Sequence, residues 1–246
     1  MGTVVTISVY PEPAATGAQR AKIPAQIQRA CDALHKADEV FSTWRPDSAI
    51  SRLRAGLITV AEAPAEVADV MAACATAREL SGGFFDPWAM PGGFDPTGYV
   101  KGWAAQRALA ALASADGVCG AMVNAAGDIA SFGHLPNGQA FRIGIADPAA
   151  PRRLAEIVEL TGAVATSGSY ERGPHLIDPS SGVPAAGAAS ASVTGPDLGL
   201  ADALATSLAV AGPAGLDFLE AIAGYEGLTI GFDGAGRSTP GFPFAR

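Results

Sequence analysis

The hydrophobic period alternates between that of helices and that of strands along this chain, and this alternation limits the folds it can adopt. Ile23, Ile27, Cys31 and Leu34 follow one another at helical spacing, which predicts an amphipathic helix. Between residues 121 and 194 the period becomes that of β-strands, and beyond residue 200 the helical spacing returns. Helices, then consecutive strands, then helices predict an α+β fold, with a mostly antiparallel sheet and helices packed on it.

Turn and cap signals divide the chain into elements, and no segment has the composition of an inter-domain linker. Asp47 and Ser48 can cap a short helix, Pro64 suits the first position of the next helix, and Gly82-Gly83 can end that helix. We therefore expect one domain over residues 1–246. The expected strands are 3–10, 121–124, 129–132, 141–145, 154–160, 163–167, 191–194 and 228–232, and the expected longer helices are 23–41, 64–80, 99–114, 200–211 and 215–223.

Composition and motifs exclude several classes of function. With 246 residues, 49% of them hydrophobic, the chain can bury a core. Its 16 Lys and Arg against 24 Asp and Glu give a net charge of −8, which argues against a nucleic-acid partner but not against a small anionic ligand. The sequence has neither a GxGxxG nor a GxxxxGK[ST] loop, so a Rossmann site and a P-loop are both unsupported.

The cysteines and the N-terminal residues give information on the cellular compartment of the protein. The three cysteines are far apart and form no CxxC pair, so neither a disulfide framework nor a zinc ribbon is indicated. No apolar run reaches the roughly 18 residues of a membrane span. The first basic residue is Arg20, so the start lacks the cationic region of a signal peptide. We expect a cytoplasmic protein, or an extracytoplasmic one if a signal precedes this chain.

Asp202 and Thr206 form the first candidate site. They are four residues apart in an expected helix, so their side chains lie on one face, one turn apart. Both offer hard oxygen atoms of the kind that Mg²⁺ or Ca²⁺ prefers. In the alternative interpretation, Asp202 caps the helix and Thr206 hydrogen-bonds back to a backbone carbonyl.

A loop rich in glycine holds the second candidate. Phe84, Phe85 and Asp86 precede it, and Asp95 follows nine residues after Asp86. Glycines in such a loop let the backbone approach a ligand closely. The alternative interpretation is a pair of ordinary Asx turns, and the sequence leaves both open.

Two basic residues complete the candidates. Lys101 stands near the start of an expected helix, where a cation does not stabilise the helix dipole, so it would make sense beside a ligand phosphate or a loop aspartate. The alternative is a solvated lysine. His175 opens an apolar run between two loops and could act as a general base near neutral pH.

Eight short motifs are spread along most of the chain. They are Met1-Gly2-Thr3; 42–48 with 51–53; 81–87; Asp95 with 100–104; 123–129; 167–172; 175–179; and 201–206. Together they resemble the ApbE family, the FAD:protein FMN transferases. Each motif is weak by itself, whereas the ordered set is specific.

The resemblance implies a single unit of the T-fold kind and Mg²⁺-dependent cleavage of FAD. FMN would pass through a phosphoester bond to a Thr or Ser in the flavinylation motif of an acceptor protein, and AMP would leave. The implied base is His175, and the implied metal ligands are the Gly98 carbonyl, Asp202 and Thr206. Trp44 and Phe85 are suited to stacking on a ring of FAD. The residues implied to line the FAD site are Met1, Trp44, Phe84, Phe85, Asp86 and Asp95.

The chain departs from the family pattern in the glycine-rich loop. Family members have a much longer insertion between the residues matching Asp86 and Asp95, so this chain is a short variant. The stretch 124–128 reads Asn-Ala-Ala-Gly-Asp where the family has Asn-Ala-Gly-Gly-Asp. The metal and histidine motifs are retained, so we expect a transferase. The alternatives are a Mg²⁺-dependent FAD pyrophosphatase that releases FMN and AMP, and a flavin-binding protein without turnover.

Overall fold

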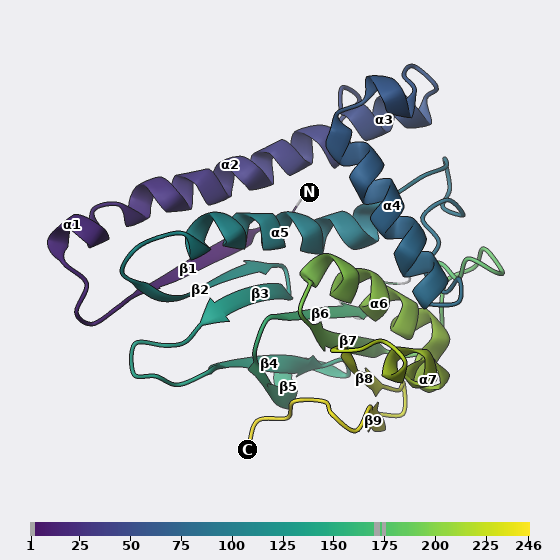
Figure 1. Cartoon of the computed structure of the whole chain (residues 1–246). Coiled ribbons are helices and arrows are strands. Elements are labelled where there is room, and N and C mark those ends of the chain that lie inside the picture. Colours follow the sequence, from purple (N-terminus) through teal and green to yellow (C-terminus); the bar gives the residue numbers. More distant parts are fainter. Residues whose placement is uncertain (1–2, 170–172, 174–175) are drawn as a thin grey trace.

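The computed structural model describes residues 3–169, 173 and 176–246. Over these residues the centre is a seven-stranded antiparallel sheet in the order β1-β2-β3-β6-β7-β8-β9, and β4 pairs with β5 in a separate hairpin (Figure 1). The first and last strands of the chain are thus the two edges of one sheet. The strands are β1 Val5–Pro11, β2 Val118–Ala125, β3 Asp128–Gly133, β4 Phe141–Asp147, β5 Ala150–Leu160, β6 Ala163–Gly168, β7 Ser190–Gly195, β8 Glu226–Ile230 and β9 Gly236–Ser238.

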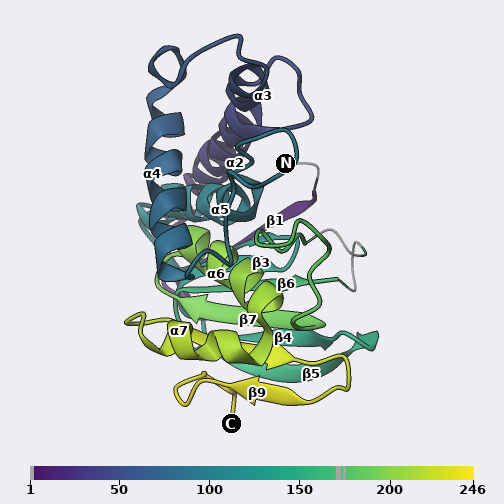
Figure 2. The same ribbon diagram turned by 90° about the vertical axis from the view of Figure 1, so that its right-hand side faces the viewer.

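Helices cover one face of this sheet. In Figure 2 the layers run from α2 and α4, through α5 and α6, to the sheet and then to the β4–β5 hairpin. α5 and α6 lie directly on the strands, α2 packs along α5, and α4 contacts α6. The helices are α1 Gly17–Arg20, α2 Ile23–Phe41, α3 Ala49–Arg54, α4 Ala65–Leu80, α5 Thr97–Ala113, α6 Leu198–Ala211 and α7 Leu216–Glu220, with 3₁₀ turns at Val60–Glu62 and Gly212–Gly215.

Small residues let α5 and α6 approach the sheet and each other. A Cβ on Gly102 of α5 would overlap the backbone oxygen of Leu198, where α6 begins. Glycine is therefore required for the two helices to cross at this distance. Apart from Val123 and Val193, the sheet residues buried beneath them are also small: Ala121, Ala125, Ala130, Ala163, Ala165 and Ala191.

The β4–β5 hairpin packs against the other face of the sheet. Phe141 and Leu160 of the hairpin form one apolar cluster with Val164 of β6. Ile145 of the hairpin joins a second cluster with Leu228 of β8. The middle of the sheet is therefore buried on both sides, and its strands alternate between these two layers.

The predicted α+β class with a mostly antiparallel sheet is confirmed. The predicted helix 23–41 is α2, and the Ser48 hydroxyl caps α3 by accepting from the backbone N–H of Ser51. Pro64 is the N-cap of α4 and not its first residue, so that boundary was wrong by one position. The short elements α1 and β9 were missed, because four and three residues are too few to establish a hydrophobic period.

One helical stretch among the described residues, Leu198–Glu220, is long and apolar enough to cross a membrane by length and composition. It joins α6 to α7 through the 3₁₀ turn Gly212–Gly215. Most of α6 is buried against the sheet and α5, which is the position of a core helix. The stretch is therefore weak evidence for a membrane span.

Candidate active site

Five polar side chains from separate parts of the chain meet near the crossing of α5 and α6. Lys101 comes from α5, Asp128 from the start of β3 and Ser167 from the end of β6; Asp202 and Thr206 come from α6. The close approach of the two helices at Gly102 brings Lys101 next to Asp202. The fold thus gathers residues that are more than 100 positions apart in the sequence.

Two buried carboxylates share the ammonium of Lys101. Its Nζ lies 2.5 Å from Oδ2 of Asp128 and 4.0 Å from Oδ1 of Asp202. Asp128 is fully buried and Asp202 is 2% exposed. Backbone N–H groups hold the remaining oxygens: Thr166 donates to Oδ1 of Asp128 at 3.1 Å, and Gly102 donates to Oδ2 of Asp202 at 3.1 Å. The carboxylates are therefore fixed in position, and their combined charge exceeds that of the lysine.

Burial and the neighbouring charges change the acidity of Asp202. Burial raises the pKa of the Asp202 carboxyl well above its ordinary value, and the neighbouring Asp128 raises it further. The Lys101 ammonium and the Gly102 N–H act in the opposite direction. The repulsion between Asp128 and Asp202 is the contribution that a further positive charge close to Asp202 would relieve.

Two hydroxyl groups form a second part of the site. Thr206 Oγ1 is 3.1 Å from the Ser167 hydroxyl of β6. Gly98, at the start of α5, lies against Thr206: a Cβ on this glycine would be 3.6 Å from Thr206 Oγ1 and 3.1 Å from the Phe85 ring. The structure therefore brings together Gly98, Asp202 and Thr206, the three residues implied as metal ligands.

The chemistry of this set fits Mg²⁺. The described residues contain no group of three or more His, Cys, Asp or Glu side chains that could hold a metal ion. The set offers one carboxylate, a hydroxyl and backbone oxygen, all of them hard donors. Mg²⁺ commonly binds through one or two carboxylates and keeps several waters or substrate oxygens, so a sparse set of protein ligands is sufficient.

The structure also decides between the two interpretations of Asp202. The cap of α6 is Asp197, whose side chain accepts from the backbone N–H of Leu200 at 2.8 Å. Asp202 lies one turn further into the helix and points to Lys101 and Gly102. The interpretation of Asp202 as the helix cap was therefore wrong. The Thr206 hydroxyl has the Ser167 hydroxyl as a hydrogen-bond partner.

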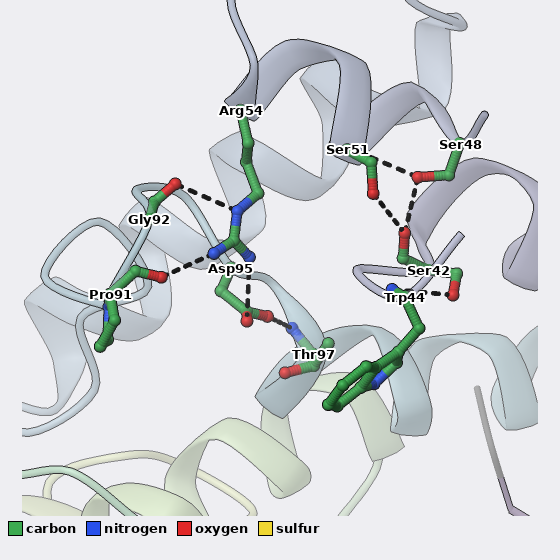
Figure 3. Close-up of polar contacts among 9 residues, drawn as sticks. All are labelled: Ser42, Trp44, Ser48, Ser51, Arg54, Pro91, Gly92, Asp95 and Thr97. Atoms are coloured by element: carbon green, nitrogen blue, oxygen red, sulfur yellow. Dashed lines mark hydrogen bonds and ion pairs between the residues drawn. The ribbon is translucent and has the colours of Figure 1, made fainter. Parts of the chain in front are cut away.

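Arginines hold the two loop aspartates. Asp86 forms an ion pair with Nε of Arg78 at 2.7 Å and accepts from the backbone N–H of Trp88. Asp95 accepts from Nη1 of Arg54 at 3.2 Å and from the backbone N–H of Thr97 at 3.0 Å (Figure 3). Both carboxylates do form Asx-type turns, and each also has a cationic partner.

The predicted aromatic residues differ in their exposure. Trp44 is 89% exposed, and its indole extends from the segment after α2 toward the part of α5 that begins at Thr97 (Figure 3). Phe84 is 41% exposed and stacks on Phe218. Phe85 is 5% exposed and packs in the core beside Gly98. The expectation that Phe85 stacks on a ligand ring is therefore corrected, because its ring faces are covered.

Lys101 is not a solvated lysine, nor does it pair with Asp86 or Asp95 as the sequence suggested. Its partners are Asp128 and Asp202, because the α5–α6 crossing turns this face of α5 toward the sheet. Met1 and His175, predicted to line the FAD site and to act as the base, lie outside the described residues.

Sequence reasoning missed three residues of the site: Asp128, Ser167 and Arg54. Asp128 offered a signal, since a carboxylate that opens an apolar strand is a candidate buried charge. Ser167 ends a predicted strand but gave no sign of its partner. Arg54 gave no signal at all, because it contacts backbone atoms 37 and 38 residues away.

Comparison with known protein families adds independent information. A sequence model of the ApbE family matches residues 1–93 and 91–229. The two matched ranges meet at residues 91–93, within the loop that the resemblance describes as shortened. A comparison with curated proteins found no match.

Similar solved structures cover nearly the whole chain. A flavin transferase ApbE from Vibrio cholerae matches with a TM-score of 0.80 at 23% identity, over 98% of this chain and 95% of that chain. The apo form of a flavinyl transferase ApbE from Pseudomonas stutzeri matches with a TM-score of 0.80 at 24% identity, over 98% and 92%. An ApbE protein from Thermotoga maritima matches with a TM-score of 0.81 at 23% identity, over 97% and 94%. At these identities the likeness shows a shared fold.

Proposed function

Because the chain belongs to the ApbE family, we propose that it is a Mg²⁺-dependent FAD:protein FMN transferase. In this reaction the hydroxyl oxygen of a Thr or Ser on an acceptor protein bonds to the phosphorus of the FMN half of FAD. The bond from that phosphorus to the AMP oxygen breaks, AMP leaves, and the acceptor hydroxyl gives up its proton. Similar folds in Vibrio cholerae and Pseudomonas stutzeri belong to proteins named as flavin and flavinyl transferases, which supports the proposal.

The observation that carries the proposal is the cluster at the α5–α6 crossing. It combines the buried carboxylate of Asp202, the hydroxyl of Thr206 and the adjacent backbone of Gly98, next to a second carboxylate, Asp128, that raises the pKa of Asp202 further. Mg²⁺ held by these three residues would neutralise charge on the pyrophosphate oxygens of FAD. Lys101, held in place by Asp128, presents an ammonium to the same anion.

The surrounding residues would orient FAD. The exposed indole of Trp44 can stack on one of its two ring systems. Phe84 offers a second, partly exposed ring. Asp95 stands at the start of α5, next to the segment that carries Gly98 and Lys101. Two further roles rest on the family resemblance. Met1 would line the FAD site, and His175 would be the base that takes the acceptor proton.

Substitution of Thr206 tests the proposed metal site. Thr206→Val keeps the shape of the side chain but removes its hydroxyl, so we expect AMP release from FAD to fall at least tenfold at limiting Mg²⁺, since one hard ligand is lost. Thr206→Ser keeps the hydroxyl and is the matched control. AMP release is measured across a Mg²⁺ titration, and thermal melting checks that both variants fold. Equal activity of the two variants at every Mg²⁺ concentration would refute this assignment.

The same assay separates the alternative functions. AMP release that no acceptor accelerates would identify a FAD pyrophosphatase, in which water replaces the acceptor hydroxyl. Bound flavin without AMP release, with any divalent metal, would identify a flavin-binding protein. The transferase requires AMP release to rise with the concentration of an acceptor that carries a flavinylation motif.

A further inference from the structure

Arg54 joins helix α3 to the short loop that precedes α5. It is the last residue of α3, and its guanidinium makes three contacts with the loop (Figure 3). Nε donates to the carbonyl of Gly92 at 3.1 Å, Nη2 to the carbonyl of Pro91 at 2.6 Å, and Nη1 to Oδ2 of Asp95 at 3.2 Å. The Arg54 and Asp95 side chains are only 20% and 23% exposed, so these contacts are partly shielded from water.

The contacts continue from the loop into α5. The second oxygen of Asp95 accepts from the backbone N–H of Thr97, the first residue of α5. The backbone N–H of Asp95 donates to the carbonyl of Pro87 at 2.9 Å, which closes the loop on itself. A continuous chain of hydrogen bonds therefore runs from Arg54 to the turn of α5 that carries Gly98, with Lys101 one turn further on.

We propose that Arg54 is a positioning residue of the FAD site: it fastens the short loop 87–95 to α3 and thereby fixes Asp95 and the start of α5. This inference rests on the proposed function and extends it to a residue that touches neither the metal ligands nor Lys101 in the described structure. In this chain the Arg54 guanidinium adds to packing inside the loop, where the Trp88 and Phe94 rings lie 5.0 Å apart and Phe94 is buried in the core.

The chemistry of arginine suits this task. A guanidinium is planar and carries five N–H donors in a fixed fork, so it can bind two carbonyls and a carboxylate together. A lysine ammonium at the end of a flexible stem cannot reach the same three acceptors in one geometry. Without the guanidinium the loop samples more conformations, and FAD has to order it on binding, which weakens binding but leaves the chemical step intact.

Two neighbouring glycines in the loop give a matched test. A Cβ on Gly92 would lie 2.5 Å from Nη2 of Arg54, so Gly92→Ala pushes the guanidinium away from its acceptors. A Cβ on Gly93 meets nothing within 4 Å. The two glycines have φ of +82° and +88°, so both substitutions impose positive-φ backbone strain and only one displaces Arg54.

The experiment compares Arg54→Met, Arg54→Lys, Gly92→Ala and Gly93→Ala with the unchanged protein. We expect Arg54→Met and Gly92→Ala to raise the FAD dissociation constant and the KM for FAD by about tenfold, through the cost of ordering the loop, with kcat at saturating FAD within about twofold. Arg54→Lys should not restore binding. Without FAD, hydrogen–deuterium exchange in 87–97 should be faster in the first two variants than in Gly93→Ala.

The outcomes separate this inference from the proposed function. If the unchanged protein binds FAD and the Arg54→Met and Gly92→Ala variants match Gly93→Ala in KM and in exchange, the role of Arg54 is overturned. If these variants lose kcat rather than affinity, Arg54 is not a positioning residue for FAD. If the unchanged protein neither binds FAD nor releases AMP, the proposed function fails, and the role of Arg54 at the FAD site fails with it.

Discussion

At the scale of single residues, the site depends on a balance of buried charge. Lys101 faces two carboxylates, of which Asp128 is fully buried and Asp202 nearly so. A buried carboxylate is tolerated when it is paired and hydrogen-bonded, and each of these has a backbone N–H as well as the lysine. We therefore expect Lys101 to have two roles: it stabilises the folded site, and it presents a positive charge to the pyrophosphate.

Substitution of Lys101 tests the first role, the stabilisation of the folded site. Lys101→Met leaves two buried carboxylates without their cation, so we expect a loss of about 3–5 kcal/mol in the free energy of unfolding at neutral pH. Lys22→Met is the control, because Lys22 pairs with Asp116 at 4.0 Å on the surface; its expected loss is within about 1 kcal/mol. Urea unfolding measures both values. Equal losses would show that Lys101 stabilises its two buried carboxylates no more than Lys22 stabilises a surface ion pair.

Cys31 and Cys74 should differ in reactivity. Burial raises the pKa of the Cys74 thiol to about 12, and its side chain is fully buried in α4. Since the thiolate is the reactive form, we expect iodoacetamide at pH 8 to modify the partly exposed Cys31 well before Cys74 in the folded protein. Peptide mass spectrometry follows both residues, with urea-unfolded protein as the reference. Equal rates in the folded protein would contradict the packing of α4.

The sequence predicts the part of the site that depends on local geometry. The pair Asp202 and Thr206 could be placed on one face of a helix because helical spacing alone determines it. The partners of Lys101 could not be predicted, because they depend on how closely α5 crosses α6. Arg54 could not be found either, since it recognises backbone carbonyls, which every residue has.

At the scale of elements, the crossing of α5 and α6 builds the site. Gly102 allows α5 to touch the backbone of Leu198, and the small residues of the sheet let both helices lie close to it. The same crossing brings Lys101 beside Asp202 and Gly98 beside Thr206. A change in the separation of these helices should therefore disturb stability and catalysis together.

Gly102→Ala tests this crossing. A glycine-to-alanine change inside a helix normally stabilises it by about 0.5–1 kcal/mol. Here the added Cβ overlaps the Leu198 carbonyl, so we expect the opposite sign, a loss of about 1–3 kcal/mol, together with lower activity. Gly17→Ala in α1 is the control, because nothing lies within 4 Å of its Cβ position. Stabilisation by both substitutions would refute the close crossing.

Most of the elements could be predicted from the sequence, since long amphipathic segments carry a clear period. The helix α2 and the strands β2 to β8 follow from such patterns, with ends that shift by a few residues. The order of the strands could not be predicted. The pairing of β3 with β6 past the β4–β5 hairpin depends on apolar contacts between distant segments, such as Val164 with Phe141.

At the scale of the whole molecule, the described chain is one interleaved unit. β1 and β9 are the two edges of the same sheet, so residues near both ends of the chain stabilise one structure (Figure 1). α5 and α6 come from opposite halves of the sequence and share a single core cluster. We propose that residues 1–246 fold as one domain.

Calorimetry tests whether residues 1–246 unfold as one domain. We expect one unfolding transition, with the calorimetric enthalpy equal to the van't Hoff enthalpy, because no part of the sheet is complete without strands from both halves of the chain. FAD with Mg²⁺ should shift that single transition upward. Two separate transitions, only one of which responds to FAD, would contradict this description.

The central claim is that this chain transfers FMN from FAD to an acceptor protein. The most direct measurement follows AMP and the mass of the acceptor in one reaction with FAD and Mg²⁺. If this claim holds, one AMP is released for each acceptor that gains a covalent FMN, and both products are lost when Mg²⁺ is chelated. AMP release in the absence of any flavinylated acceptor, at the same rate with and without acceptors bearing the flavinylation motif, would contradict it.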